Sequence, residues 1–253
     1  MADNQVIKLS ELKSHCQNCS LYDLCLPMGL DTGDLDKLDN VIKRRQSVNK
    51  NNFLFRMGDS LKSVYAIRSG SFKTYLTNPD GTEQIVGFSL PGELLGMDAI
   101  SENEHVCSAK ALETSNVCEI PFERLESLAR DIPNLQHQLF RLMSKEIQQD
   151  QTSMLLLAQM PADTRLASFL LGMSERLNKR GYAAGEFNLS MSRGDIANLL
   201  GMAVETISRL LGHFQDDRLL KVERKHITIL DLDRLRKLAT HCASNCPDSS
   251  QVS

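Results

Sequence analysis

The chain has 253 residues, of which 42% are hydrophobic and 24% charged, and its formal net charge is −3. These values are ordinary for a globular protein, and the length allows two domains. No apolar run approaches the length of a membrane span, and residues 1–5 lack the basic and apolar regions of a signal peptide. We therefore expect a cytoplasmic protein with no membrane partner, and we expect its seven cysteines to serve a metal or redox role rather than a disulfide framework.

The charge is unevenly distributed along the chain. Residues 161–241 contain 13 Lys and Arg against 10 Asp and Glu, so this part is mildly basic while the remainder is acidic. A basic domain weakly favours nucleic acid as its partner.

Three cysteines lie within ten residues near the amino terminus, as Cys16, Cys19 and Cys25 in a C-x2-C-x5-C pattern. Thiolates gathered in this way suit an iron–sulfur cluster, which takes four such ligands. Zinc is the alternative, because C-x2-C also serves zinc, although no second pair at that spacing follows. The fourth ligand must come from farther along the chain, and Cys107 and Cys118 are the candidates before the long helix described below.

The next segments change from helical to strand-like patterns. Residues 31–45 have the spacing of a short helix. From residue 47 to residue 121, short apolar runs alternate with turn signals such as residues 78–81 (Asn-Pro-Asp-Gly). Many short strands at such intervals predict a double-sheet jelly roll or a small barrel.

A long helix is predicted between Pro133 and Pro161, because no Gly or Pro interrupts the sequence between them. It would span about 40 Å. One set of its residues repeats in the a/d pattern of a coiled coil. These are Phe140, Met143, Ile147, Asp150, Met154 and Leu157. In a parallel pair of helices the two Asp150 side chains would repel each other, so we expect a marginal dimer unless Asp150 simply faces water. A second stripe, Leu135, Leu139 and Leu142, can dock the helix on its own chain.

The carboxyl-terminal part has the spacing of a helix-turn-helix. Ser192 and Asp195 form a capping signature before one helix, and residues 204–214 form the next. The second helix has a packed apolar face, which leaves Glu205, Ser208 and Arg209 free to enter a major groove and hydrogen-bond to base edges. The alternative is a solvated face with a Glu205–Arg209 ion pair. Residues 219–230 read as two strands around a basic tip, a wing that can contact phosphates.

This order of parts resembles the fumarate and nitrate reduction regulators (FNR), the oxygen-sensing branch of the cyclic-AMP receptor protein/FNR superfamily. The resemblance rests on the amino-terminal cysteines, Cys118 before Glu-Ile-Pro, and the Glu205-x-x-Ser208-Arg209 reader. It implies an α+β fold: a cysteine-rich segment (1–30), a β-jelly-roll sensor domain (31–132), a dimerisation helix (133–160), a winged helix-turn-helix (161–241) and a polar tail (242–253). It implies a transcription regulator, activator or repressor, and not an enzyme.

The resemblance also implies the site residues. A 4Fe-4S cluster would be held by Cys16, Cys19, Cys25 and Cys118, and neighbouring Ser20 and Leu24 would tune its reaction with oxygen. The homodimer would form when the cluster is intact and bind double-stranded DNA at a TTGAT-type palindrome. RNA polymerase would contact surfaces around residues 77–81 and 177–187. Cys107 is then a buried thiol, and Cys242 and Cys246 have no assigned role.

Three rival functions remain open from sequence. A cyclic-nucleotide sensor is suggested by residues 91–96 (Pro-Gly-Glu-Leu-Leu-Gly), but residues 104–108 lack the Arg that a buried phosphate needs. An iron–sulfur enzyme would need acid or base groups beside the cysteines, and none is evident. A zinc-stabilised repressor would be blind to oxygen.

Overall fold

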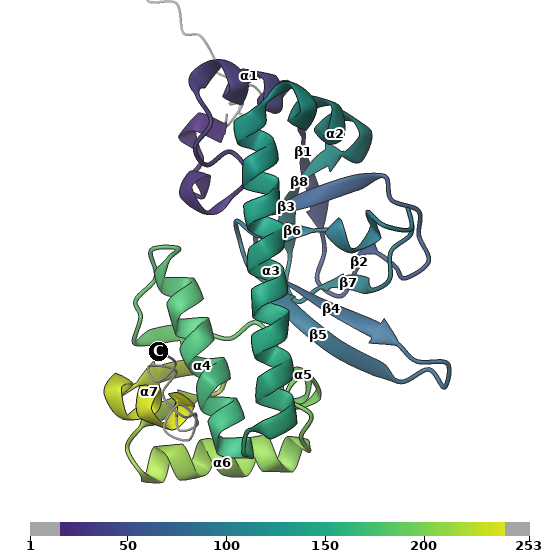
Figure 1. The fold of residues 1–253 in the computed structure, drawn as a ribbon. Helices are drawn as coiled ribbons and strands as arrows, with labels where there is room; N and C mark the ends of the chain where they lie inside the picture. The colour runs from purple at the N-terminus through teal and green to yellow at the C-terminus, as the bar shows by residue number, and fades with distance from the viewer. Residues whose placement is uncertain (1–15, 241–253) are drawn as a thin grey trace, which may run out of the picture.

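The computed structural model describes residues 16–240. A sandwich of strands lies beside a long helix, α3 (Pro133–Gln159), and a smaller domain follows at the far end of that helix (Figure 1). The predicted polar tail, with Cys242 and Cys246, and residues 1–15 lie outside the described residues. Within residues 16–240 the helices are too short or too polar to cross a membrane.

The sandwich consists of two four-stranded antiparallel sheets. The first has the order β1-β8-β3-β6, formed by β1 (Lys43–Val48), β8 (Ser115–Pro121), β3 (Ser63–Ser69) and β6 (Leu94–Leu95). The second has the order β2-β7-β4-β5, formed by β2 (Phe53–Phe55), β7 (Ser108–Ala111), β4 (Phe72–Thr77) and β5 (Glu83–Ser89). A short 3₁₀ turn, η4 (Met97–Ala99), follows β6. The predicted jelly-roll class is confirmed.

The core between the sheets is formed by alternate residues of the strands. Successive side chains of a strand point to opposite faces, so every second side chain of β3 and β8 points inward. Phe72, Ile67 and Val117 are buried there, together with the thiol of Cys107. The Asn78–Thr82 turn that joins β4 to β5 is closed by a hydrogen bond from the Asn78 amide to the Thr82 carbonyl, at 2.9 Å. The predicted turn signal is therefore confirmed.

The helix predicted over residues 31–45 is only partly right. Helix α1 (Thr32–Val41) is capped by Asp31, which accepts from the Asp34 amide at 2.8 Å. The chain then becomes extended at Ile42, and β1 pairs with β8. Residues 43–45 favour a helix by local propensity, but pairing along the sheet edge satisfies their backbone and outweighs that weak preference.

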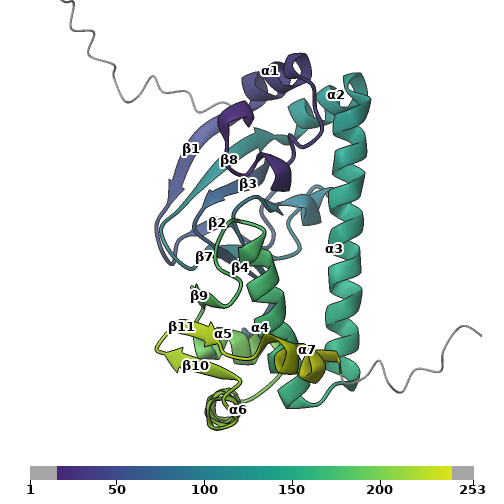
Figure 2. The ribbon, with the colours of Figure 1, turned by 90° about the vertical axis from the view of Figure 1, so that its left-hand side faces the viewer.

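A second core lies outside the first sheet, where the cysteine-containing segment packs. This segment has two 3₁₀ turns, η2 (Cys16–Asn18) and η3 (Tyr22–Leu24). It is covered by α1, by α2 (Phe122–Asp131), which the sequence analysis missed, and by the first turns of α3 (Figure 2). Leu26, Leu38, Ile120 and Leu135 are almost fully buried in this core.

Helix α3 begins with Pro133 in its first turn and ends at Gln159, before Pro161, as predicted. Leu135 is fully buried, and Leu139 and Leu142 are partly buried against the second core. The predicted docking stripe is therefore confirmed.

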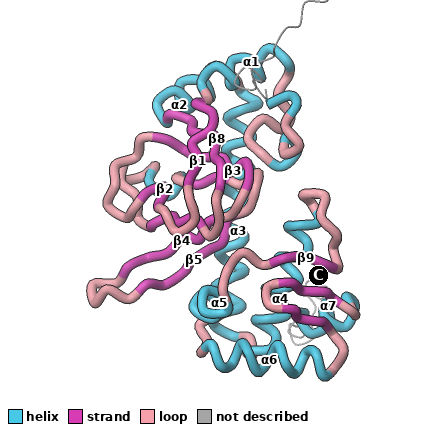
Figure 3. The backbone as a smooth tube through the Cα atoms, turned by 180° about the vertical axis from the view of Figure 1, so that it is seen from behind, coloured by secondary structure: helices cyan, strands magenta, loops and turns pink. Residues whose placement is uncertain are grey.

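The carboxyl-terminal domain contains four helices and a three-stranded sheet within the described residues. They are α4 (Ala162–Asn178), β9 (Glu186–Asn188), α5 (Arg193–Leu199), α6 (Val204–Asp216), β10 (Leu220–Glu223), β11 (His226–Ile229) and α7 (Leu232–Thr240). Its hydrophobic core continues into the sandwich, since Phe88 of β5 contacts Phe169 of α4 edge to face, with ring centroids 6.1 Å apart. Seen from behind, the β4–β5 hairpin lies beside α5 (Figure 3). The sensor and DNA-binding parts expected from the sequence are thus joined by a third hydrophobic cluster, to which both contribute buried side chains.

Leu135→Ala should lower the free energy of unfolding by about 2–5 kcal/mol, because it leaves a cavity in the second core. The matched control is Leu76→Ala, at a side chain that is 38% exposed on β4, which should cost much less. Denaturant titration of both variants measures the difference. Equal losses would contradict the account of this core.

Candidate metal centre and nucleic-acid interface

Four cysteines line one small cavity between the amino-terminal segment and the first sheet. Cys16, Cys19 and Cys25 come from the segment of 3₁₀ turns, and Cys118 comes from the middle of β8. The cavity encloses about 40 Å³. The structure thus brings the four predicted ligands together although Cys118 is remote from the others in sequence.

Backbone hydrogen bonds fold the segment so that its thiols share this cavity. The Cys19 amide donates to the Cys16 carbonyl at 3.1 Å, and the Tyr22 amide donates to the Cys19 carbonyl at 3.0 Å. The Tyr22 hydroxyl donates to the Leu30 carbonyl at 3.2 Å, and the Cys16 amide donates to Asp39 Oδ1 of α1 at 3.1 Å. These contacts fold the segment on itself and join it to α1.

The walls of the cavity are mainly apolar side chains, including Leu26 and Ile120. Burial raises the pKa of the Cys25 thiol to about 12, and the nearby thiols of Cys118 and Cys19 add to this shift because neighbouring thiolates repel one another. A bound cationic metal centre would reverse that preference, since it binds thiolates.

The donor set suits a group that takes four soft ligands in an apolar setting, as an iron–sulfur cluster does. Among residues 16–240, no three Cys, His, Asp or Glu side chains gather closely enough to hold a single metal ion. The thiols therefore surround the cavity rather than converge on one point.

The other candidate thiol, Cys107, is in a different place. It is buried in the core between the sheets, where its Sγ lies 3.4 Å from Asp98 Oδ2 and burial raises its pKa. It does not line the four-cysteine cavity.

The two residues predicted to tune the cluster lie beside the cavity rather than in its wall. Ser20 is exposed and Leu24 is half-buried. A Cβ placed on Gly92, in the turn before β6, would lie 3.0 Å from the Leu24 Cβ. Leu24 therefore touches the sandwich next to the cysteine segment.

Residues 104–108, the stretch compared with a cyclic-phosphate site, pack against the carboxylate of Asp98. His105 is buried, stacks on Phe55 with ring centroids 3.7 Å apart, and places Nδ1 3.2 Å from Asp98 Oδ1. The Val106 amide also donates to Asp98, at 3.1 Å. A carboxylate here would repel a phosphate, so this stretch is poorly suited to the cyclic-nucleotide function.

Gln138 of α3 was missed by the sequence analysis. It is buried, and its Nε2 donates to the Cys25 carbonyl at 3.4 Å. A polar residue in the docking stripe of Leu135, Leu139 and Leu142 was the available signal. The hydrogen bond joins the cysteine segment directly to the long helix.

Beyond these first turns, α3 exposes an apolar stripe. Phe140 is 61% exposed, Ile147 56% and Met154 70%, and Met143 and Leu157 are also exposed. Asp150 lies within the stripe and is exposed as well. All six predicted seam residues therefore lie on a surface that a second helix could cover.

The helix-turn-helix is formed by α5 and α6. Ser192 and Asp195 make the predicted reciprocal capping box at the start of α5. On α6, Ile207, Leu211 and Phe214 are buried and Leu210 is partly buried, so the helix has the packed apolar face that its sequence predicts. Local capping and a 3.6-residue period thus fix the two helices.

The three predicted reading residues lie on the outer side of α6. Glu205 and Arg209 are exposed and form no ion pair with each other in the described structure. Ser208 is half-buried, and its Oγ lies 3.3 Å from Arg193 Nη1 of α5. The strands β10 and β11 pair beside the helices, as expected of a wing, with exposed Arg224 at the tip.

The two surfaces predicted to contact RNA polymerase differ in character. The turn over residues 77–81 lies at the tip of the β4–β5 hairpin. Within the segment over residues 177–187, the Arg180 side chain is only 5% exposed and is paired with Glu93 of the sandwich. Part of that second surface is therefore occupied within the chain.

Two family models match the chain. A Crp-like helix-turn-helix domain matches residues 164–238, and a cyclic nucleotide-binding domain matches residues 45–131. The "Anaerobic regulatory protein" of Haemophilus influenzae is 52% identical over 88% of this chain and 87% of that protein. The "Fumarate and nitrate reduction regulatory protein" of Escherichia coli K12 is 52% identical over 90% of this chain and 91% of that protein. Among solved structures, FixK2 from Bradyrhizobium japonicum superposes with a TM-score of 0.72 at 30% identity, over 78% of this chain and 97% of that one.

Proposed function

Because this chain belongs to the Crp/FNR family of transcription regulators, we propose that it senses oxygen through a 4Fe-4S cluster and controls genes of anaerobic metabolism. The matched relatives are regulators and not enzymes. In this proposal the intact cluster permits a homodimer, and the dimer binds TTGAT-type palindromic operators and contacts RNA polymerase.

The observation that carries the proposal is the shared cavity of Cys16, Cys19, Cys25 and Cys118. These four thiols would hold the cluster, which when bound supplies an oxygen-sensitive link between the amino-terminal segment and β8. The apolar walls around them restrict water. Ser20 and Leu24, at the margin, would control access to it.

The segment can act on the dimer seam because it is joined to α3. Gln138 donates to the Cys25 carbonyl, and Leu135 packs in the same core as Leu26. A movement of the segment therefore changes how the first turns of α3 sit on the sandwich. The exposed stripe begins at Phe140, within one turn of Gln138, so its presentation changes as well.

The seam is suited to a switch because it is weak. Its exposed apolar side chains favour pairing, whereas two Asp150 carboxylates facing each other oppose it. A coupling of about 1–3 kcal/mol, which is typical between distant sites, can then decide between monomer and dimer. A monomer presents one reading helix instead of two at a fixed spacing, so operator affinity falls.

Base recognition would come from α6. Arg209 is exposed and can pair bidentately with guanine O6 and N7, Glu205 can accept from a cytosine amino group, and Ser208 can serve either role. The wing tip would contact phosphates and supply no sequence preference. RNA polymerase would contact the exposed 77–81 turn and the 177–187 loop.

Cys118→Ser should abolish the cluster, whereas Cys107→Ser, at a buried thiol outside the cavity, should retain it. Iron and acid-labile sulfide per chain, with the visible absorbance after oxygen-free purification, measure the result. Colourless parent protein containing zinc and no sulfide would reject the cluster in favour of the zinc alternative.

Asp150→Ala should leave a dimer in air, because the repulsion at the seam is removed. Gln149→Ala, at an exposed neighbour outside the a/d set, should behave like the parent chain. Sedimentation measures the mass of each. An aerobic monomer of the Asp150→Ala chain would rule out the seam argument.

Arg209→Ala should weaken operator binding by about 1–3 kcal/mol and relax the preference at one guanine, with little effect on random DNA. The control is Arg224→Asn at the wing tip, where Asn tolerates the positive φ of 60°. This change should weaken both kinds of DNA alike. An equal loss on both DNAs for Arg209→Ala would instead make Arg209 a phosphate contact.

A further inference from the structure

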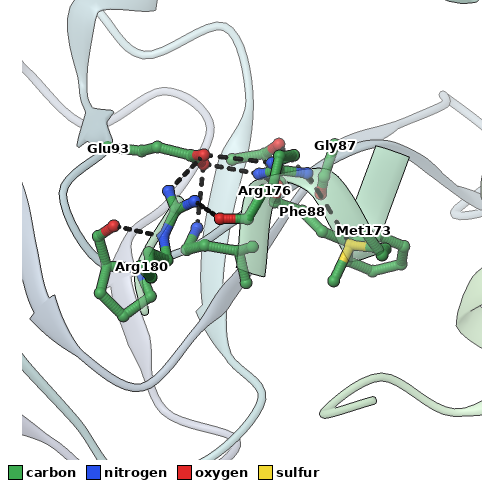
Figure 4. A network of polar contacts seen from close by, with 9 residues as sticks. Gly87, Phe88, Glu93, Met173, Arg176 and Arg180 are labelled. Carbon is green, nitrogen blue, oxygen red and sulfur yellow. Dashed lines mark hydrogen bonds and ion pairs between the residues drawn. The ribbon is translucent and has the colours of Figure 1, made fainter. Parts of the chain in front are cut away.

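Glu93, in the turn before β6, joins the sandwich to helix α4 of the DNA-binding domain (Figure 4). Its Oε2 accepts from Arg176 Nη2 at 2.6 Å, and its Oε1 accepts from Arg180 Nη2 at 2.7 Å and from Arg176 Nε at 3.1 Å. One carboxylate of the sensor domain thus receives two guanidinium groups of the other domain.

The same arginines also bind backbone carbonyls of the sensor domain. Arg176 Nη2 donates to the Phe88 carbonyl at 2.6 Å, and Arg180 Nε donates to the Pro91 carbonyl at 2.6 Å. The Arg180 side chain is 5% exposed. Burial opposes the ionisation of Glu93, but the charges and hydrogen bonds of the two arginines outweigh it, so the pKa of this carboxyl lies below its ordinary value. The group is an interdomain contact in a partly desolvated setting, where charge-assisted hydrogen bonds are strong.

The other side of this turn touches the cysteine segment. Gly92 has a φ of +89°, and a Cβ at this position would lie 3.0 Å from the Leu24 Cβ. Leu24 directly precedes Cys25 in the chain. The turn therefore lies between the cysteine segment and α4: it approaches Leu24 on one side and is hydrogen-bonded to Arg176 on the other.

A second interdomain contact lies at the β4–β5 hairpin. The Ile85 amide donates to Asn198 Oδ1 of α5 at 2.6 Å, and Lys73 Nζ donates to Asp195 Oδ1 at 2.8 Å. These groups make no contact with Glu93 in the described structure. The hydrogen bond of the Ile85 amide therefore reports whether the two domains stay docked. A change at Glu93 that acts only on its own surroundings would leave this hydrogen bond intact.

We propose that Glu93 is a positioning residue for DNA binding, which fixes the DNA-binding domain on the sensor domain and transmits movements of the cysteine segment to it through the Gly92–Leu24 contact. This inference rests on the proposed function. Through Glu93, a movement of the cysteine segment reaches the DNA-binding domain of the same chain, in addition to its effect on pairing through the seam of α3. The physical consequence of the Glu93 contact is a fixed distance between the two reading helices of a dimer, and hence a strict half-site spacing.

The first test measures hydrogen exchange at the Ile85 amide in the full-length chain, which requires neither DNA nor a dimer. Glu93→Gln removes one charge with little change of shape and should speed exchange there about tenfold, because an interdomain hydrogen bond to a charged group is lost. Glu102→Gln, at an exposed acid of the same domain, should leave the rate unchanged. Unchanged exchange in the Glu93→Gln chain would overturn the proposal.

Leu24→Ala tests the link to the cysteine segment. It should speed exchange of the α4 amides near Arg176 and Arg180 a few-fold, because the turn loses its support on that side. Met28→Ala, at a half-buried residue of the same segment, is the control and should have no such effect. Equal effects of the two changes would remove the transmission step.

The second test measures operator affinity at three half-site spacings: the natural one, one base pair longer and one base pair shorter. Oxygen-free parent protein should strongly prefer the natural spacing, and Glu93→Gln should reduce that preference about tenfold. An equal loss of affinity at all three spacings would mean that Glu93 only stabilises the fold. If the parent binds no operator, the proposed function fails, while the exchange measurement still decides the role of Glu93.

Discussion

The contact between the cysteine segment and the first turns of α3 is the constraint on which the rest of the structure depends. Leu135 is fully buried in the core that also contains Leu26, and Gln138 donates to the Cys25 carbonyl. Because one helix carries both this contact and the exposed stripe from Phe140 onward, the position of the segment and the presentation of the seam are mechanically connected. In the proposed function, a change at four thiols becomes a change in pairing through this connection.

The sandwich serves as the frame that makes such coupling possible. Cys118 lies in the middle of β8, between β1 and β3, so the remote thiol is held by a rigid strand while the other three lie in short turns. The inner core is filled by side chains, and residues 104–108, where a cyclic phosphate would need a cation, pack against the carboxylate of Asp98. The hydrophobic core that continues from Phe88 to Phe169 then carries the frame into the DNA-binding domain. The two domains are therefore coupled by packing as well as by the ion pairs of Glu93.

Much of this arrangement follows from local patterns in the sequence. Pro133 and Pro161 delimit α3, Ser192 and Asp195 cap α5, and two-residue alternation identifies most strands. The prediction fails where tertiary pairing decides, as at residues 43–45, which were expected to end a helix and instead begin β1. It also missed Gln138 and the partners of Glu93, because these hydrogen bonds join residues 113 and 83 positions apart and no spacing rule connects them. The cysteine spacing indicated a metal centre, but only the fold brings Cys118 to the other three.

The central claim is that the integrity of a centre held by Cys16, Cys19, Cys25 and Cys118 determines whether two chains stay paired. The most direct measurement records molar mass by light scattering and visible absorbance in one sample of purified, oxygen-free protein while oxygen is added in steps. The account predicts that the mass halves in proportion to the loss of the absorbance. A dimer that persists after the colour has gone, or dissociates before it fades, would contradict the account.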